Sequence, residues 1–275
     1  MKMKKLTALA TAAALVSSIV CSTQAFAADN LLEQIKEDGV LQVVMEPYFA
    51  PYEFCDTSKE GQEQYCGADV ELAKYIADDL GVELEIVPLE FSAVLASIVA
   101  EKYPMAISGL GYTPERAESV ELSDSYRTTD AVHGFVVRKE DVDKYPDLDS
   151  LAGKTIAYQN GSLQDMYTNA QIKDPVTKPF DSVNNAILAL QSGKCDAVAV
   201  YYDNGELFVD ANDDLAMAEA VFEDTKDTTV IACPKGETEL IGEVNRIIAD
   251  VTEQGLYEQW WDDAVEQAKG LGLDK

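Results

Sequence analysis

The segment at residues 108–117, with the sequence SGLGYTPERA, combines residue types that are suited to holding an anion. A run of apolar residues ends there in a glycine-rich turn, and a helix start follows, with Thr113 suited to the N-cap and Pro114 to the first helical position. Free backbone N–H groups at a helix start, beside the Arg116 guanidinium, can hold a carboxylate through charge-assisted hydrogen bonds. The same residues also fit an ordinary capped helix with Arg116 in a surface ion pair. The segment is therefore a candidate carboxylate site with a purely structural alternative.

Catalytic and metal-binding patterns do not develop elsewhere in the sequence. His133 is the only histidine and the cysteines are not clustered, which argues against a zinc centre, a Cys–His pair or a Ser–His–Asp triad. Gly109 and Gly111 are followed by Pro114 rather than by a third glycine, so the dinucleotide-binding fingerprint is incomplete. The acidic run 210–214 lacks the glycine and final glutamate of a calcium loop and is interpreted as a solvated loop. We expect no catalytic residue, no metal and no cofactor.

The elements that must position the candidate site alternate between strands and helices. Helical spacing of apolar residues predicts helices at 70–80, ending at Gly81, and at 92–100. Short apolar runs predict strands at 40–44, 83–87 and 105–108. This alternation indicates an α/β domain with a largely parallel sheet.

A second unit of the same kind follows residue 137. Strands are predicted at 155–158 and 196–200, with helices starting near residue 162 and spanning 182–191. Residues 94–107 and 186–198 share the order helix, lysine-bearing turn, strand, so each half carries a similar unit. Two such sheets facing each other leave a cleft beyond the carboxyl ends of their strands, where open α/β sheets bind ligands.

The N-terminal residues have the pattern of a secretory signal peptide. Lys2, Lys4 and Lys5 precede an apolar stretch at 6–20, and the small-residue triplet 25–27 follows. We therefore expect residues 1–27 to be a signal peptide and the protein to be exported to the periplasm or the extracellular side. Cys21 leaves lipid attachment, and hence tethering to the cell surface, as an alternative, although Val20 stands where a small residue is usual.

The charge of the chain excludes one large class of partners. Its formal net charge is −29, and cleavage of the lysine-bearing signal peptide would make the charge more negative. Such a chain repels the phosphate backbone, so we expect no nucleic-acid partner. We interpret the excess of acids as a solvated surface.

Four cysteines remain after residue 27, and they allow three pairings. Cys55 and Cys66 flank a polar stretch typical of a hairpin tip, so we predict a disulfide between them. Cys195 and Cys233 fit either a second disulfide or two buried thiols.

The motif Thr113-Pro114-Glu115-Arg116 after Ser108-Gly109 resembles the signature of the bacterial amino-acid-binding proteins that serve ABC importers, the extracellular solute-binding proteins of family 3. Segments along the rest of the chain resemble the same family in order and spacing; they are residues 39–41, 48–54, 67–73, 121–126, 151–162 and 193–198. The resemblance covers essentially the whole chain after the signal peptide.

The resemblance implies a two-lobed clamshell that closes on its ligand by a hinge motion. Lobe 1 would comprise residues 28–136 and 231–275, and lobe 2 residues 137–230, with hinges near 135–137 and 229–231. The implied function is the substrate-binding component of an ABC importer, which captures an amino acid or related small carboxylate metabolite and delivers it, as a monomer, to a membrane permease. The alternative is a clamshell-derived enzyme such as a cyclohexadienyl (prephenate or arogenate) dehydratase, in which Glu46 or Asp203 would act as general acid or base.

The family pattern also implies the ligand contacts. Arg116 would hold the ligand's carboxylate, and the side-chain pocket would be lined by Phe49 and Phe91. The supporting residues would be Ser108, Gly109, Gly111, Thr113 and, from the opposite lobe, Ser162.

Two positions depart from the family pattern. Tyr201 stands where an aspartate usually neutralises the ligand's ammonium group. Asp203 would lie on the same side of an extended chain and could replace it, or Tyr201 and Tyr202 could offer aromatic faces to an N-methylated cation. Glu46 falls where acidic side chains of relatives face the far end of the ligand, and would favour a polar or cationic group there.

Overall fold

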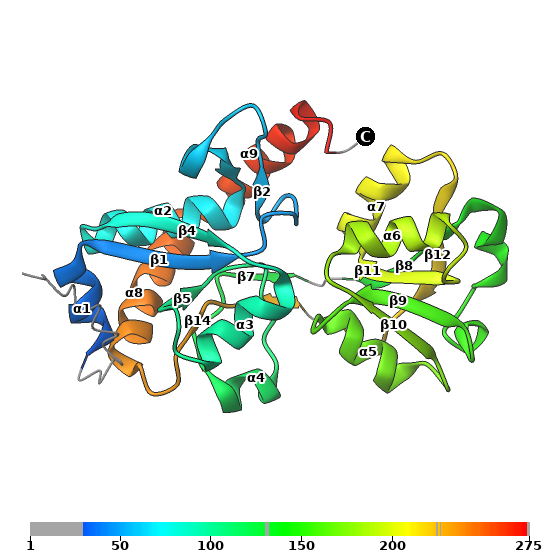
Figure 1. Cartoon of the computed structure of the whole chain (residues 1–275), viewed down its shortest axis with the longest axis horizontal. Helices are drawn as coiled ribbons and strands as arrows, with labels where there is room; N and C mark the ends of the chain where they lie inside the picture. The colour runs from blue at the N-terminus through cyan, green and yellow to red at the C-terminus, as the bar shows by residue number, and fades with distance from the viewer. Residues whose placement is uncertain (1–29, 130–131, 224, 226, 274–275) are drawn as a thin grey trace, which may run out of the picture.

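The computed structural model describes residues 30–129, 132–223, 225 and 227–273. These residues form two α/β lobes, which Figure 1 shows side by side. The predicted two-lobed α/β architecture is confirmed. The expected signal peptide, residues 1–27, lies outside the described residues.

The first lobe is built on a mixed sheet with the strand order β4-β1-β5-β14-β6. The first three strands are parallel, and β14 runs antiparallel to both of its neighbours. The sheet consists of β4 (Glu83–Pro88), β1 (Val40–Met45), β5 (Met105–Ala106), β14 (Ala232–Cys233) and β6 (Glu121–Leu122). Because β14 comes from near the end of the chain, this sheet is completed only by residues that follow the second lobe.

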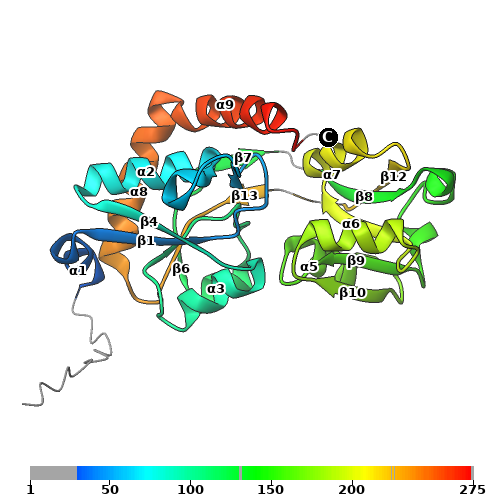
Figure 2. The ribbon, with the colours of Figure 1, turned by 45° about the horizontal axis from the view of Figure 1, so that its top comes forward.

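Helices cover both faces of this sheet (Figures 1 and 2). The helix α2 shows why they pack there: its apolar residues recur at helical spacing and are buried, and it ends at Gly81, which adopts the left-handed conformation with φ 73°. One face is covered by α1 (Leu31–Asp38), α2 (Ala68–Leu80), α8 (Thr238–Gln254) and α9 (Leu256–Gly270). The other is covered by α3 (Phe91–Val99) and α4 (Pro114–Ser119).

The second lobe has a sheet with the strand order β10-β9-β11-β8-β12. Its strands are β10 (Val176–Phe180), β9 (Thr155–Gln159), β11 (Ala197–Tyr201), β8 (His133–Arg138) and β12 (Leu215–Val221). One face packs on α5 (Leu163–Gln171) and on the short 3₁₀ segments Lys139–Lys144 and Asp149–Leu151, and the other packs on α6 (Val183–Gln191) and α7 (Tyr202–Ala211). Each lobe therefore has its own hydrophobic core.

Two short antiparallel strands lie at the passage between the lobes, β7 (Arg127–Thr129) and β13 (Asp227–Thr229). The expected lobe boundary after residue 136 falls inside β8, whose residues pair only with β11 and β12 of the second sheet. The apolar run 135–137, expected to be a hinge, is buried in the second lobe because β8 is an interior strand there.

The predicted disulfide between Cys55 and Cys66 is wrong, because both are free thiols in the structure. They lie on the antiparallel strands β2 (Phe54–Cys55) and β3 (Tyr65–Cys66), but the register pairs Cys55 with Tyr65 and Cys66 with Phe54. This offset of one residue directs the two side chains to opposite faces of the ribbon. The Cys66 thiol instead lies 3.5 Å from the carbonyl of Gln64. Cys195 and Cys233 are buried free thiols.

We therefore expect Cys55 and Cys66 to react with a thiol-alkylating reagent in denaturant whether or not the protein has first been reduced. Peptide mass spectrometry of the alkylated protein measures this directly, and the buried Cys233 serves as an internal reference for a thiol that needs no reduction. Labelling of Cys55 and Cys66 only after reduction would contradict the register.

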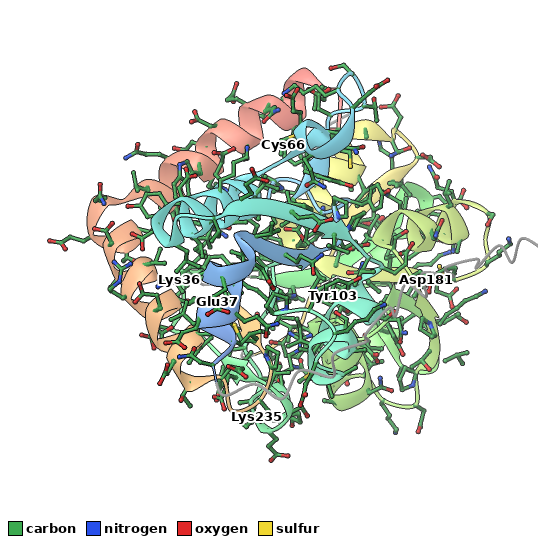
Figure 3. All side chains as sticks on the ribbon, turned by 60° about the vertical axis from the view of Figure 1, so that its left-hand side comes forward. Lys36, Glu37, Cys66, Tyr103, Asp181 and Lys235 are labelled. Carbon is green, nitrogen blue, oxygen red and sulfur yellow. The ribbon has the colours of Figure 1, made fainter. Side chains whose placement is uncertain are left out.

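The outer surface carries the excess of acidic residues. Figure 3 shows oxygen-tipped side chains projecting from most of the visible elements, and Lys36 and Glu37 lie on the solvent side of α1. Among the described residues, no helix is long and apolar enough to cross a membrane. Five acidic residues of the described chain are exceptions to the outward pattern because they are buried: Glu46, Glu53, Asp56, Asp69 and Asp141. The most deeply buried of them are Glu46, Glu53 and Asp69.

Candidate functional site

A small cavity lies where the two lobes face each other. From the first lobe it is lined by Phe49, Phe91, Gly109, Gly111 and Arg116. From the second lobe it is lined by His133, Gln159, Ser162, Leu163, Gln164 and Tyr201. Seven of the residues predicted from the sequence are thus brought together, and they come from both halves of the chain.

Arg116 reaches across the cavity from the first turn of α4. Thr113 caps this helix by accepting a hydrogen bond from the Arg116 N–H at 3.1 Å, and Pro114 occupies the first helical position, as predicted. The guanidinium is buried and donates hydrogen bonds to the carbonyl of Gly111 and, at 2.9 Å, to that of Gly161 in the second lobe. A ligand carboxylate could replace these neutral acceptors, because charge-assisted hydrogen bonds are roughly twice as strong.

The glycine turn before α4 shapes the cavity but does not offer the N–H group expected from it. Gly109 has φ +52° and donates its N–H to the buried carboxylate of Asp69 at 2.7 Å. A Cβ atom at this position would lie 3.2 Å from the ring of Phe49, so glycine is required for both conformation and space. The contribution of Gly111 is its carbonyl, which accepts from Arg116.

Ser108 and Thr113 lie behind the cavity rather than on its wall. The Ser108 hydroxyl accepts from the N–H of Glu46 at 3.0 Å and donates to Glu53 at 2.7 Å. The Thr113 hydroxyl is used as the helix cap. Both are buried and support the residues that line the cavity, which differs from the direct contacts that the sequence suggested for them.

Glu46 forms a second contact between the lobes. Its carboxyl group accepts a hydrogen bond from the amide of Gln159 at 2.7 Å, and its side chain is only 2% exposed. Burial raises the pKa of Glu46 to about 8; the Gln159 hydrogen bond opposes this shift, and the charge of Glu90 adds to it. The group is therefore largely protonated near neutral pH until a cation approaches it.

Phe49 and Phe91 form the apolar part of the wall. The ring of Phe49 is stacked on that of Tyr52, with centroids 5.2 Å apart and an angle of 2° between the planes. Phe91 is the first residue of α3. Both therefore line the cavity from the first lobe, where the sequence placed them.

Known proteins resemble this chain in sequence and in fold. The sequence model of the bacterial extracellular solute-binding proteins, family 3, matches residues 41–263. The chain belongs to this family. The L-cystine-binding protein TcyJ of Escherichia coli (strain K12) is 27% identical over 256 residues, which cover 91% of this chain and 92% of the relative. The arginine-binding extracellular protein ArtP of Bacillus subtilis (strain 168) is 28% identical, over 87% of this chain and 92% of the relative.

A solved structure shares this two-lobed fold. It is that of AbpA, an amino acid ABC transporter substrate-binding protein of Streptococcus pneumoniae, bound to L-arginine. The two chains are 35% identical with a TM-score of 0.79, and the match covers 88% of this chain and 100% of the other. In this family 3 protein, the cavity between the lobes is thus the natural candidate for the ligand site.

Tyr201 lies at the cavity, where the sequence suggested, but Asp203 does not. Tyr201 is buried at the cavity, opposite His133 in the pairing of β11 and β8. The premise that residues 201–203 are extended is wrong, because α7 begins at Tyr202. Asp203 therefore lies in the first turn of a helix rather than two residues along a strand, and neither it nor Tyr202 lines the cavity.

Sequence reasoning missed four residues of the cavity wall: His133, Gln159, Leu163 and Gln164. A signal was present for two of them. Gln159 follows the predicted strand 155–158, and Gln164 lies at the start of the helix predicted after Ser162, so both occupy the strand–helix connection where open α/β sheets bind ligands. For His133, the sequence patterns concerned a zinc centre, a Cys–His pair and a Ser–His–Asp triad, all of which the sequence disfavoured, so none of them pointed to a ligand contact. No group of residues suited to a metal ion occurs in the described part of the chain.

A buried pair of carboxyl groups supports the glycine turn from below. Asp69 accepts hydrogen bonds from the hydroxyls of Tyr257 at 2.6 Å and Tyr126 at 3.0 Å, and from the N–H of Gly109. Glu53 is also fully buried and adjoins Asp69; burial and the Asp69 charge hold its pKa well above the usual range, so it is protonated and can donate to Asp69. Burial also raises the pKa of Asp69, but the hydrogen bonds from Tyr257, Gly109 and Tyr126 oppose this shift, so a proton shared by the pair lies preferentially on Glu53.

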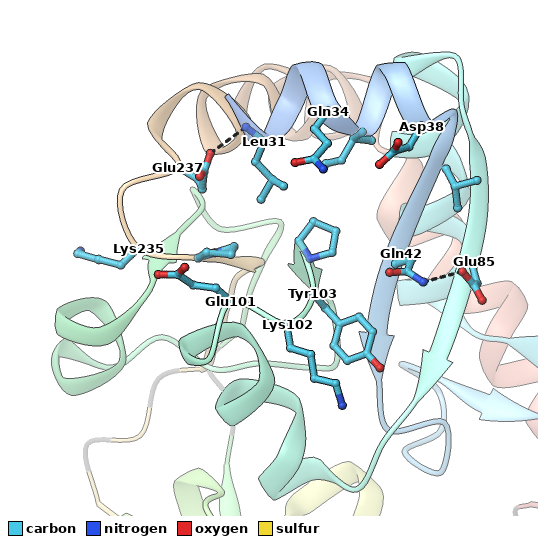
Figure 4. Close-up of a pocket in the computed structure, with 14 residues that line it drawn as sticks. Leu31, Gln34, Asp38, Gln42, Glu85, Glu101, Lys102, Tyr103, Lys235 and Glu237 are labelled. Atoms are coloured by element: carbon cyan, nitrogen blue, oxygen red, sulfur yellow. Dashed lines mark hydrogen bonds between the residues drawn. The ribbon is translucent and has the colours of Figure 1, made fainter. Parts of the chain in front are cut away.

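Another depression lies on the first lobe, away from the cavity between the lobes (Figure 4). It is bounded by α1 and by the loops at 101–104 and 234–237. Two pairs of its polar groups bond to each other: Gln42 donates to Glu85 at 2.8 Å, and the N–H of Leu31 donates to Glu237 at 3.3 Å. No residue that the sequence predicted for the site lines this depression.

Proposed function

We propose that the protein is the substrate-binding component of an ABC importer and captures an amino acid in the cavity between its lobes. The observation that carries this proposal is that Arg116, on the cavity wall, bonds to the opposite lobe, and that Glu46, beside the cavity, bonds to Gln159 on the opposite wall. A ligand that replaces the partners of these groups would contact both lobes at once. Ligand binding and closure of the lobes would then be one event, which a membrane permease can sense.

We further propose that the ligand has a carboxylate at one end and a cationic or polar group at the other. Arg116, with Ser162, would hold the carboxylate, and Phe49 and Phe91 would cover the aliphatic part. Glu46 and Gln159 would take the distal group. Arginine fits this description, and arginine is the ligand in the solved relative.

We also propose that the N-terminal part and the C-terminal segment of the chain form the first lobe, and that the stretch between them forms the second. We propose in addition that residues 1–27 are a signal peptide, and that the protein is a monomer that delivers its ligand to the permease in the membrane. The dehydratase alternative is disfavoured, because the relatives named above are binding proteins, Glu46 is held by Gln159, and Asp203 is outside the cavity wall.

Isothermal titration calorimetry with the proteinogenic amino acids and cystine tests this function. We expect saturable binding of at least one basic or polar amino acid. Cooperative unfolding is the control that shows the protein to be correctly folded. If such a protein gives no heat with any member of the panel, the amino-acid proposal is refuted.

The affinity for a cationic ligand should rise with pH below about 8. Glu46 has its pKa raised by burial to about 8, so binding a cation beside it must release the proton of this carboxyl group. The affinity should then increase by up to tenfold per pH unit between about 6 and 8 and level off above that range. Titrations across this range measure it, and Glu46→Gln should remove the dependence. An affinity of the wild type for arginine that is independent of pH would contradict contact with Glu46.

A further inference from the structure

His133 lies at the cavity on the wall formed by the second lobe, as the first residue of β8. It stands opposite Tyr201 in the register of β8 and β11, so the two side chains share one face of the sheet. Their ring centroids are 5.6 Å apart, and the ring of Tyr167 from α5 packs against the imidazole at 5.3 Å. Only 1% of the residue is exposed. The imidazole is therefore held between two tyrosine rings.

The two ring nitrogens of His133 differ in their surroundings. Nδ1 lies 2.8 Å from the side-chain amide of Gln164, which also lines the cavity. Nε2 is buried and has no hydrogen-bond partner among the described residues. A buried polar atom in this situation forfeits the hydrogen bond it would make in water, which is uncommon in folded proteins. A molecule in the cavity would supply the partner that the protein does not.

The second lobe offers uncharged groups to such a molecule. Burial lowers the pKa of His133 to about 4, so its ring is neutral at neutral pH. Ser162, Gln159 and Gln164 provide hydroxyl and amide groups, and Tyr201 provides an aromatic ring; none of the described second-lobe residues on the cavity wall is an acid. A neutral imidazole accepts or donates one hydrogen bond at Nε2, depending on which nitrogen carries the proton.

We propose that Nε2 of His133 hydrogen-bonds the substituent on the ligand's α-carbon. It would take over the role of the aspartate that the family pattern has at the position of Tyr201. This inference rests on the proposed function, because it requires the ligand's carboxylate to lie on Arg116. The side-chain amide of Gln164 can rotate by 180°, so that either its oxygen or its nitrogen faces Nδ1 and either tautomer of His133 is matched. The contact at Nε2 therefore serves an amino or a hydroxyl group of the ligand equally. The site therefore accepts α-hydroxy acids as well as amino acids, since it lacks the full charge that would favour an ammonium.

Nuclear magnetic resonance of the wild-type protein tests the contact, because His133 is the only histidine of the chain. The probe is a mixture of the proteinogenic amino acids with cystine, added to ¹⁵N-labelled protein. We expect the Nε2 resonance of the imidazole to shift together with the backbone resonances of Gly109 and Gly111. A response of the glycines with an unchanged imidazole would overturn the role of His133 and leave the proposed function standing. No response at either place would refute the proposed function itself.

Calorimetry of two variants measures the strength of the contact. His133→Phe keeps a ring between Tyr167 and Tyr201 but removes both nitrogens, and should weaken binding of L-arginine by about tenfold or more. Thr168→Val is the matched control, because Thr168 also has a buried oxygen without a partner among the described residues but lies outside the cavity wall. It should leave the affinity unchanged. Equal affinities of His133→Phe and the control would overturn the proposal. If His133→Phe does not fold, the resonance experiment on the wild type is the deciding test.

The α-hydroxy analogue of arginine, L-argininic acid, tests the ligand class. It should bind within about tenfold of L-arginine, because an uncharged contact discriminates weakly between the two α-substituents. A loss of more than about a hundredfold would overturn the proposed class.

Discussion

Replacing Arg116 with alanine should weaken binding of a carboxylate ligand by about two orders of magnitude, corresponding to the loss of about 3 kcal/mol from charge-assisted hydrogen bonds in a buried site. The guanidinium is held at the cavity by the capped start of α4 and already reaches Gly161 in the opposite lobe. Its loss would therefore remove both the grip on the ligand and one contact between the lobes. Titration calorimetry with the ligand identified from the amino-acid panel measures the change.

Two further variants are compared with Arg116→Ala. Arg116→Lys keeps the charge but not the two-pronged geometry, and should give an intermediate loss. Arg246→Ala is the matched control, because Arg246 lies on the surface of α8, where it pairs with Asp79 and Glu243. It should bind like the wild type. An affinity of Arg116→Ala equal to that of the Arg246→Ala control would show that the carboxylate lies elsewhere.

Replacing Asp69 with alanine should destabilise the first lobe by roughly 3–5 kcal/mol, because it leaves the buried donors of Tyr126, Tyr257 and Gly109 without an acceptor. Glu53→Gln should cost no more than about 1 kcal/mol, since an amide can donate to Asp69 as the protonated carboxyl group does. Urea unfolding curves measure both changes. Asp78→Ala, at an exposed position of the same helix, is the control and should lie within about 0.5 kcal/mol of the wild type.

The same pair predicts how stability depends on pH. The pKa of Glu53 is raised in the folded state, so its protonated form is the one that the fold stabilises. This contribution is complete below the ordinary carboxyl pKa and is lost as the pH rises toward the raised value in the folded protein. The Glu53→Gln variant should lose less stability than the wild type when the pH is raised. Equal destabilisation by Glu53→Gln and Asp69→Ala would mean that Glu53 is not a proton donor to Asp69.

Local sequence signals were sufficient for much of the fold and for Arg116. Apolar spacing and glycine stops decide where α2 begins and ends, and the Thr113–Pro114 start of α4 is a local signal that places the guanidinium. The failures have a different origin. The register of β2 and β3 depends on a shift of a single residue, and no breaker separates the strand ending at Tyr201 from the helix starting at Tyr202.

Contacts between distant parts of the chain could not be read from local patterns. Glu46 meets Gln159 across 113 residues, and Asp69 meets Tyr257 across 188. The burial of Glu46 and Asp69, and hence the shift of their pKa values, results from these long-range contacts. His133 was overlooked for a related reason, since its position opposite Tyr201 follows from strand pairing rather than from neighbours in sequence.

The dependence of the first lobe on α9 has a consequence for how the protein is made. Tyr257 bonds to Asp69, the Trp261 ring packs on Tyr52, and β14 is an interior strand of the first sheet. The second lobe, in contrast, is one continuous stretch of chain. It can fold as soon as it has been synthesised, whereas the lobe that begins the chain must wait for its last helix. The first lobe thus stays incomplete until α9 has been synthesised.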